Sequence, residues 1–276
     1  MVGLRIESSI HSCTTEAAMK SSGIELDPVD LQQLRRSCGD CALGELCLPA
    51  GIDHADLERL DTAVRDKRTL ERGDSLHRQG DSFHSLYVVR SGSLKTVVES
   101  DAGDAQVLGF HLPGELIGVD ALAHDRHLCS AEALERTSVC ELPYDQLQRV
   151  MTEVPSLQRQ LMRVVSREVV AEQGHLVMMG RQQAQERLAI FLQSLSERYG
   201  RLSRDTVTLT LTMSRYDIAN YLGLVVETVS RLFTRMEAAG VLAVRRKTVE
   251  ILKPDLLAAM CGNQGNGTKA LRSKQV

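Results

Sequence analysis

The sequence contains no run of about 18 consecutive apolar residues, the length that a membrane-spanning helix requires. It also lacks the apolar core of a signal peptide, because Arg5, Glu7 and Lys20 interrupt the apolar pieces near its beginning. These two absences predict a chain that stays in the cytoplasm and has no membrane partner.

The signatures of common enzyme classes are missing as well. There is no P-loop, no G-x-G-x-x-G and no nucleophile elbow, and histidines and carboxylates form no cluster along the chain. We therefore expect that the protein is not an enzyme. With 276 residues, 43% hydrophobic and 25% charged, the composition is that of an ordinary globular protein of one or two domains.

Charge is divided unevenly along the chain. The net charge is only −3, but residues 181–276 carry 15 Lys and Arg against 8 Asp and Glu, a balance of +7. The preceding part therefore carries −10. A cationic last third on an acidic body is typical of a chain whose C-terminal part meets a polyanion.

Residues 68–145 consist of short alternating apolar stretches, such as 85–89, 94–98 and 107–110. Glycine-containing turns separate these stretches every seven to eleven residues. This pattern predicts a small antiparallel β-roll.

After Pro155 the apolar period changes from two to about 3.5, which predicts one long helix. The helix could lie on its own roll or pair with its copy in a second chain, and we expect the pairing. Glutamates on the seam make that pairing marginal, because like charges face each other across the two-fold axis. The predicted dimerisation residues are Leu157, Leu161, Val165, Glu168, Val169, Glu172, Leu176 and Met179.

A second helix is predicted over residues 184–199, closed by Gly200, and a strand over 207–211. Ser214 and Asp217 then form a capping-box pattern that opens a short helix. Gly223 allows a sharp turn before another helix near residue 226. These spacings are typical of a helix-turn-helix.

The outer face of that last helix carries Glu227, Ser230 and Arg231. Arginine can bind guanine bidentately, glutamate can accept from cytosine, and serine can address several base edges. A predicted hairpin follows, and its tip holds Arg245, Arg246 and Lys247, a wing suited to phosphate. An ordinary solvated Glu/Arg pair is the competing interpretation, and the turn, wing and charge bias together favour DNA binding.

Three of the seven cysteines, Cys38, Cys41 and Cys47, lie within ten positions. In a reducing compartment thiols at such short spacing indicate a soft metal centre, either zinc or iron–sulfur. The spacing matches neither ferredoxin pattern, and it lacks the second half of a zinc ribbon. A fourth ligand must come from elsewhere, and the candidates are Cys13, Cys129, Cys140 and Cys261.

Over about residues 37–255 the sequence resembles the oxygen-responsive regulators of the CRP/FNR superfamily, in the branch of the fumarate and nitrate reductase regulator. The motifs that carry the resemblance are S-C-G-D-C…C, R-S-G-S-L-K, G-F-H-L-P-G-E-L-I-G, L-T-M-S-R-Y-D-I-A-N-Y-L-G and V-E-T-V-S-R. The resemblance implies a [4Fe-4S] cluster bound by Cys38, Cys41, Cys47 and Cys140.

The same resemblance implies that Glu227, Ser230 and Arg231 read a TTGAT-like half-site, repeated as a palindrome for a homodimer. It further implies that the loop around residues 99–104 contacts RNA polymerase. The chain departs from the family at Val225, where a threonine is usual.

The cyclic-nucleotide branch of the superfamily needs a glutamate for the ribose and an arginine for the cyclic phosphate. At the corresponding points this chain has Gly118-Val119 and Cys129-Ser130-Ala131, so we expect no cyclic nucleotide. Besides a cyclic-nucleotide regulator, two alternatives to an oxygen sensor stay open: a regulator with a structural zinc, and an iron–sulfur enzyme or electron carrier.

The predicted fold is α+β, with a cyclic-nucleotide-binding-like β-roll (jelly roll), a long dimerisation helix and a C-terminal winged helix-turn-helix. The predicted parts are a flexible extension 1–36, a cluster loop and roll 37–150, the dimerisation helix 151–181, the DNA-binding domain 182–261 and a disordered tail 262–276.

Overall fold

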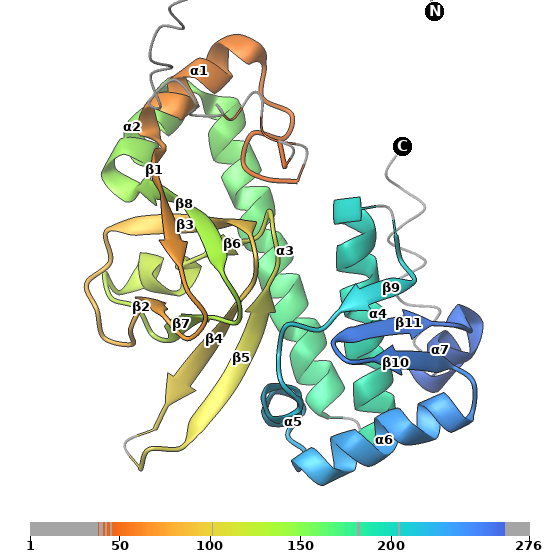
Figure 1. The fold of residues 1–276 in the computed structure, drawn as a ribbon. Helices are drawn as coiled ribbons and strands as arrows, with labels where there is room; N and C mark the ends of the chain where they lie inside the picture. The colour runs from red at the N-terminus through yellow and green to blue at the C-terminus, as the bar shows by residue number, and fades with distance from the viewer. Residues whose placement is uncertain are drawn as a thin grey trace, which may run out of the picture. The chain divides into compact units, whose positions relative to one another are not determined.

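A computed structural model describes residues 38, 41, 43–44, 46–100, 102–180, 183–203 and 205–262. The predicted flexible extension 1–36 and the tail from residue 263 onward lie outside this description. In the described part the fold is α+β, with a roll of strands, a long helix and a winged helix-turn-helix, as predicted (Figure 1).

The roll consists of two four-stranded antiparallel sheets with the orders β1-β8-β3-β6 and β2-β7-β4-β5. The strands are β1 (Arg65–Leu70), β2 (Ser75–His77), β3 (Ser85–Ser91), β4 (Leu94–Glu99), β5 (Ala105–His111), β6 (Leu116–Ile117), β7 (Ser130–Ala133) and β8 (Thr137–Pro143). A short 3-10 helix, η1 (Val119–Ala123), follows β6.

Strand β3 is buried on both of its faces, which explains its nearly continuous apolar sequence. One face contributes Val89 to the core of the roll, together with Ile117 and Val139. The other face contributes Leu86 and Val88 to a second cluster, which is completed by helices.

Three helices also contribute to that second cluster: α1 (His54–Ala63), α2 (Tyr144–Glu153) and α3 (Pro155–Met179). Helix α1, which the sequence analysis did not predict, begins at Asp53, whose side chain accepts a hydrogen bond from the backbone of Asp56. Val154 separates α2 from α3, and Pro155 occupies the first turn of α3, where its missing N–H costs nothing.

Helix α3 packs on its own roll along one face, the alternative that the sequence left open. Leu157 is fully buried and Leu161 is 7% exposed, and both lie in the second cluster, with Val165 packed beside them. These residues were predicted to face a partner chain, and that part of the prediction is wrong. Met179, at the other end, packs against the core of the winged domain.

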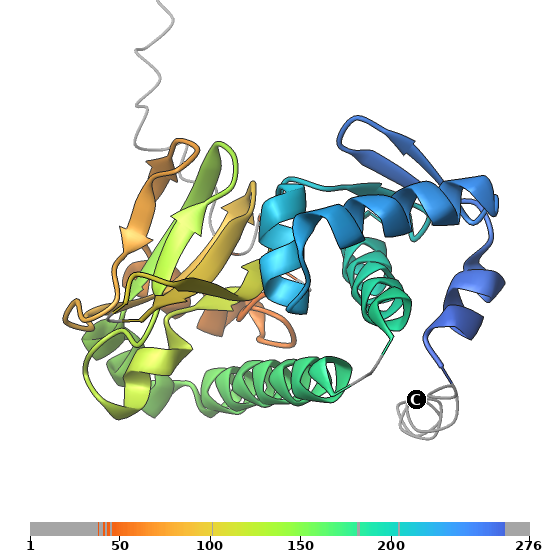
Figure 2. The same cartoon turned by 90° about the horizontal axis from the view of Figure 1, so that it is seen from below.

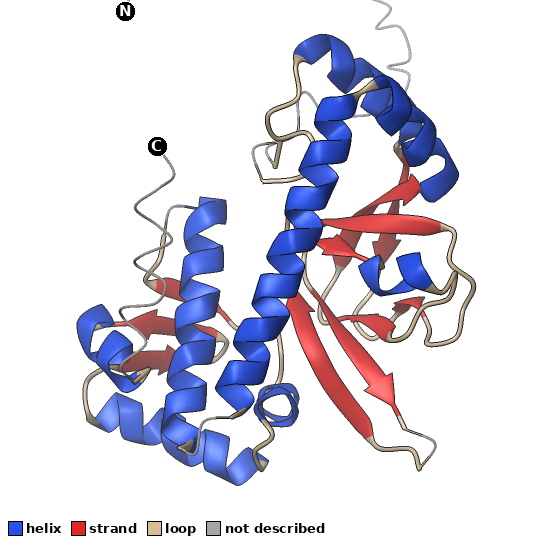
Figure 3. Ribbon diagram, turned by 180° about the vertical axis from the view of Figure 1, so that it is seen from behind, coloured by secondary structure: helices blue, strands red, loops and turns tan. Residues whose placement is uncertain are grey.

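The face of α3 that stays exposed carries a different apolar set, whose members are 48–70% exposed. The set is Met162, Val169, Val170, Leu176 and Val177. Val169 and Leu176 were among the predicted dimerisation residues. The course of α3 between the roll and the winged domain can be followed in Figure 3.

The C-terminal part comprises α4 (Ala184–Ser203), β9 (Thr208–Thr210), α5 (Arg215–Leu222), α6 (Val226–Ala238), β10 (Leu242–Arg245), β11 (Thr248–Ile251) and α7 (Pro254–Met260). Its sheet has the order β10-β11-β9, and α6 contacts both α4 and β10 (Figure 2). Helix α4 does not end at Gly200 as predicted. A Cβ atom at Gly200 would lie 2.5 Å from Thr206, so the glycine permits a close approach instead of a helix end.

Among the residues that the structure describes, no helix combines the length and the apolar character needed to cross a bilayer.

Two histidines, His77 on β2 and His127 before β7, stack inside the roll with their ring centroids 3.6 Å apart. They are 6% and 3% exposed. Burial, and then the neighbouring His127, lower the pKa of His77 to about 4, although Asp120 and Asp81 act in the opposite direction. The folded roll therefore needs a neutral imidazole at His77.

Acidification should destabilise the fold through this histidine. Between the unfolded pKa of about 6.5 and the folded value, only the unfolded chain takes up the proton, so the free energy of unfolding falls as the pH decreases. Replacement His77→Phe should remove about 2 kcal/mol of the loss between pH 7 and pH 5, measured by urea unfolding. His124→Gln, at an exposed position, should keep the original slope. An unchanged slope in His77→Phe would contradict the assignment.

Candidate metal centre and nucleic-acid interface

Four cysteines line one apolar pocket at the end of the roll. Cys38, Cys41 and Cys47 come from the loop that precedes α1, and Cys140 comes from β8, where it pairs with Val88 of β3. The walls include Leu48, Pro49, Leu60, Val64, Val89 and Leu142, and Arg90 is the charged residue among the lining side chains described. The structure thus brings together the four residues that the sequence analysis selected.

The loop is wound by successive turns that direct its cysteines to one side. The backbone N–H of Cys41 donates to the carbonyl of Cys38, that of Gly44 to Cys41, and that of Cys47 to Leu43. A Cβ at Gly44 would stand 3.3 Å from the Cys41 oxygen, which is tight. The sequence therefore needs a small residue where the loop bends back.

The protein environment alone favours neutral thiols in this pocket. Burial raises the pKa of Cys47 to about 12 and also raises that of Cys140. Burial raises the pKa of Cys38 too, and Asp61, which accepts a 2.6 Å hydrogen bond from the Cys38 backbone, adds to the effect. Thiolate ligands therefore form here together with a cation that replaces their protons.

The thiols surround a volume instead of converging on a point. No three His, Cys, Asp or Glu side chains in the described parts of the chain are arranged to hold a single metal ion. A tetrahedral zinc needs all its sulfurs at about 2.3 Å from one position. In an iron–sulfur cluster each cysteine binds its own iron, so the sulfurs stand further apart. The pocket brings together thiols, the ligand type that both kinds of centre use.

The remaining described cysteines lie elsewhere. Cys129 is buried in the roll, with its sulfur 3.6 Å from an Asp120 oxygen. Cys261 is buried beside α4 and donates to the side chain of Gln193. Neither lines the pocket, and Cys13 lies outside the described residues.

The helix-turn-helix forms as its capping pattern predicted. The Ser214 hydroxyl accepts from the backbone N–H of Asp217, and the Asp217 carboxylate accepts from the backbone of Ser214, so both halves of the capping box are present. Gly223 ends α5 with φ of +61°, the left-handed conformation that glycine adopts without strain.

Helix α6 has one buried and one exposed face. Val229, Leu232, Phe233 and Met236 are buried in the winged-domain core. Glu227, Ser230 and Arg231 are exposed on the opposite face, so all three predicted base-reading side chains are available to a ligand. This face has the size and chemistry of an element that enters a major groove.

The predicted basic tip lies at the turn of the β10–β11 hairpin. Arg245, Arg246 and Lys247 are exposed, and Arg246 has a positive φ of 57°. The hairpin register, with Arg245 opposite Thr248, leaves the next two residues in the turn. Three cations thus stand at the end of a strand pair that packs beside α6.

Helix α6 begins without a side-chain cap. Val225 occupies the capping position in extended conformation, makes no capping hydrogen bond and is 64% exposed. The departure from the family noted in the sequence therefore leaves unpaired N–H groups at the start of the reading helix.

Known proteins are similar to this chain over both the roll and the winged domain. Residues 67–154 match the family model of a cyclic nucleotide-binding domain, and residues 186–260 match that of a Crp-like helix-turn-helix domain. The chain is 45% identical to the transcriptional activator protein Anr of Pseudomonas protegens over 242 residues, which cover 87% of this chain and 99% of the relative.

Two further relatives extend this similarity. The fumarate and nitrate reduction regulatory protein of Escherichia coli is 39% identical over 229 residues, covering 83% of this chain and 92% of the relative. The solved structure of FixK2 from Bradyrhizobium japonicum has a TM-score of 0.65 and 26% identity, covering 71% of this chain and 96% of that one. The matches span the roll, the long helix and the winged domain.

A restored cap should stabilise the winged domain. In Val225→Thr the new hydroxyl can accept from the backbone N–H of Glu227, since that of Thr228 already donates to the Val225 carbonyl. The free energy of unfolding should rise by about 1 kcal/mol in urea. Leu256→Thr, at an exposed position inside α7, is the control and should bring no gain. Equal effects of both substitutions would show that capping is not the cause.

Proposed function

Because the chain belongs to the family of Anr and the fumarate and nitrate reduction regulatory proteins, we propose that it is a transcription regulator that senses oxygen through a [4Fe-4S] cluster. Membership makes it a DNA-binding regulator of transcription, and the nature of the signal is our proposal. The observation that carries it is the pocket that Cys38, Cys41, Cys47 and Cys140 line.

The loop that carries Cys47 contacts the long helix α3 directly. Gln160 of α3 is 6% exposed and donates a 3.4 Å hydrogen bond to the Cys47 carbonyl. Leu48, one residue further, packs in the same cluster as Leu157 and Leu161 of α3. A change in the loop therefore acts directly on the base of α3.

When bound, the cluster would supply four iron–thiolate bonds and a reaction with oxygen that breaks them. With those bonds in place the loop is tied to β8 at Cys140, and its apolar residues stay seated against α3. Without them the loop is held by its turns, by its hydrogen bonds with Asp61 and Gln160, and by the packing of Leu48 and Ile52. This is a two-state element that a distant signal can bias.

We propose that the exposed stripe of α3 forms the dimer seam. Met162, Val169 and Leu176 recur every seven residues, the period of paired helices. Glu172 is exposed between them, so like charges approach across the two-fold axis and keep the pairing weak. A weak seam suits a switch, because a few kcal/mol decide between monomer and dimer.

In the dimer two copies of α6 present Glu227, Ser230 and Arg231 to successive major grooves, about 34 Å apart along the duplex. The proposed site is a TTGAT-like palindrome, and Arg245, Arg246 and Lys247 would bind flanking phosphates. The turn over residues 99–104 is the proposed contact for RNA polymerase. Within it the backbone N–H of Ser100 donates to the carbonyl of Asp104.

Removal of the fourth ligand tests the proposal. Protein purified without air should be coloured, contain iron and sulfide, and bind the palindrome more tightly than air-exposed protein. Cys140→Ala should lose the visible absorbance and at least about tenfold in anaerobic affinity, about 1.4 kcal/mol. Cys129→Ala, which removes a buried cysteine outside the pocket, should keep both. Colourless zinc-containing protein, or a coloured Cys140→Ala, would refute the ligand assignment.

The dimer seam has its own test. Leu176 is 70% exposed in the single chain, so Leu176→Glu should fold normally but place two more charges across the axis. Anaerobic sedimentation velocity should show a monomer. Leu256→Glu, on the exposed face of α7, should still dimerise. If Leu176→Glu dimerises like the unmodified protein, the seam lies elsewhere.

A further inference from the structure

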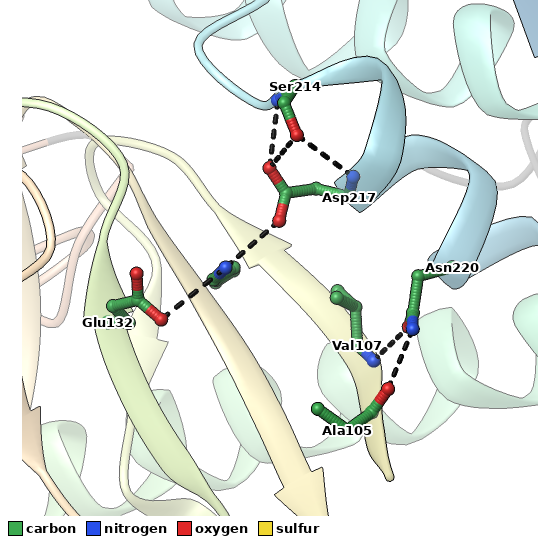
Figure 4. Close-up of polar contacts among 7 residues, drawn as sticks. Ala105, Val107, Glu132, Ser214, Asp217 and Asn220 are labelled. Atoms are coloured by element: carbon green, nitrogen blue, oxygen red, sulfur yellow. Dashed lines mark hydrogen bonds and ion pairs between the residues drawn. The ribbon is translucent and has the colours of Figure 1, made fainter. Parts of the chain in front are cut away.

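Helix α5, the first helix of the helix-turn-helix, is docked on the free edge of the roll. Strand β5 is the last strand of its sheet, so one row of its backbone groups has no strand neighbour. The Asn220 side chain accepts from the N–H of Val107 at 2.6 Å and donates to the carbonyl of Ala105 at 2.7 Å (Figure 4). One amide side chain thus pairs with β5 as the backbone of another strand would.

The contact is reinforced in both directions. Gln106 of β5 donates through its side chain to the backbone carbonyl of Asn220 at 2.8 Å. Just before β4, the hydroxyl of Ser93 lies 2.7 Å from that of Thr212, which precedes α5, and both residues are buried.

A second tie lies one turn of α5 away. Lys95 of β4 donates to Asp217 at 2.9 Å and lies 3.4 Å from Glu132 of β7. In Figure 4 the dashed lines for these two contacts run to Asp217 on one side and to Glu132 on the other. The Lys95 and Asp217 side chains are 16% and 10% exposed, so water screens this pair less than a surface pair. The carboxylate that joins the roll is also the one that caps α5.

The surroundings of Lys95 and Asp217 favour the charged form of both side chains. Burial lowers the pKa of Lys95, but the hydrogen bonds and charges of Asp217 and Glu132 together outweigh it, and the pKa ends above its ordinary value. Burial likewise opposes the charge of Asp217, and hydrogen bonds from Ser214 and Lys95 hold its pKa below the usual range. Both groups are therefore charged at neutral pH. Loss of either removes the ion-pair partner of the other, and leaves Lys95 with Glu132 alone or Asp217 with its hydrogen bonds from Ser214 alone.

These contacts fix the orientation of the reading helix. Helices α5 and α6 are joined by the Gly223 turn and share one core, so α6 follows α5. Asp217 and Asn220 are three residues apart and face the same sheet, so the two ties together oppose rotation of α5 on the roll. The chain link between α3 and α4 spans only residues 180–183.

We propose that Lys95 and Asn220 are positioning residues that set the distance between the two reading helices of the dimer, and hence the half-site spacing that the protein accepts. This inference rests on the proposed function, because it requires a dimer that reads two half-sites. A palindrome is bound as a unit only if both copies of α6 meet the groove one turn apart. Loosening α5 should therefore relax spacing and leave each half-site contact intact.

The experiment measures anaerobic binding, by fluorescence anisotropy, to palindromes with the native spacer, one base pair less and one base pair more, and to an isolated half-site. The variants are Lys95→Met and Asn220→Asp. The aspartate keeps an acceptor for Val107 but loses the donor to Ala105 and retains the size of the side chain. Lys95→Arg is the conservative variant, and Ser194→Ala, exposed on α4, is the control.

We expect the preference for native over altered spacing to fall about fivefold in Lys95→Met and in Asn220→Asp, the effect of about one lost hydrogen bond. Half-site affinity should stay within about twofold, and Lys95→Arg and Ser194→Ala should behave like the unmodified protein. An unchanged spacing preference in both variants would overturn the inference, and so would higher affinity at every spacing, which indicates an inhibitory contact. Failure of the unmodified protein to bind the palindrome would refute the proposed function instead.

Discussion

The packing of α3 against β3 is the interaction on which the other parts depend. Leu157 and Leu161 meet Leu86 and Val88 in a cluster that also holds Leu48 from the cysteine loop. Each fully buried side chain of this size contributes about 1.5–3 kcal/mol. The loop, the sheet that carries Cys140 and the long helix therefore share one core. A protein interior is close-packed, so a displacement of Leu48 cannot be absorbed locally and must be passed to the helix.

Close to the middle of α3, an ion pair joins α4 to the roll. Arg198 of α4 binds the carboxylate of Glu115 in the turn before β6 through two nitrogens and also donates to the carbonyl of Phe110. Burial raises the pKa of Glu168 on α3 to about 7, and Glu115 adds to the effect. Glu168 thus interacts within its own chain, which leaves Glu172 as the exposed glutamate at the seam. The sequence predicted like-charge repulsion from both residues, and of the two Glu172 is the one exposed in the single chain.

The sequence predicted features that depend on neighbouring residues, such as caps and turns. It did not predict which face of α3 meets the roll, nor contacts between residues far apart in the chain. The capping box at Ser214 and the turn at Gly223 depend on neighbours within a few residues, so their patterns sufficed. Helix α1 was not predicted from the sequence, although its capping residue Asp53 was the available signal. Helix α3 has apolar residues on two faces, and periodicity alone cannot say which face meets the roll, so the predicted dimerisation residues included Leu157 and Leu161, which pack inside the chain. The predicted helix end at Gly200 was wrong for another reason, because this glycine is needed for the close approach of Thr206.

The Lys95 and Asn220 contacts were beyond any pattern, because their partners lie more than a hundred residues away. Their position explains why one hairpin can serve two tasks. Strands β4 and β5 carry the turn over residues 99–104 at one end, while their sides hold α5 through Lys95 and the backbone of β5. A rigid hairpin transmits orientation better than a loop, because its cross-strand hydrogen bonds fix both strands together. A polymerase contact at the turn and a DNA-reading domain at the side would then keep a constant separation. Activation through the proposed polymerase contact would require that constancy, since the protein and the polymerase would have to meet the same duplex at a defined distance.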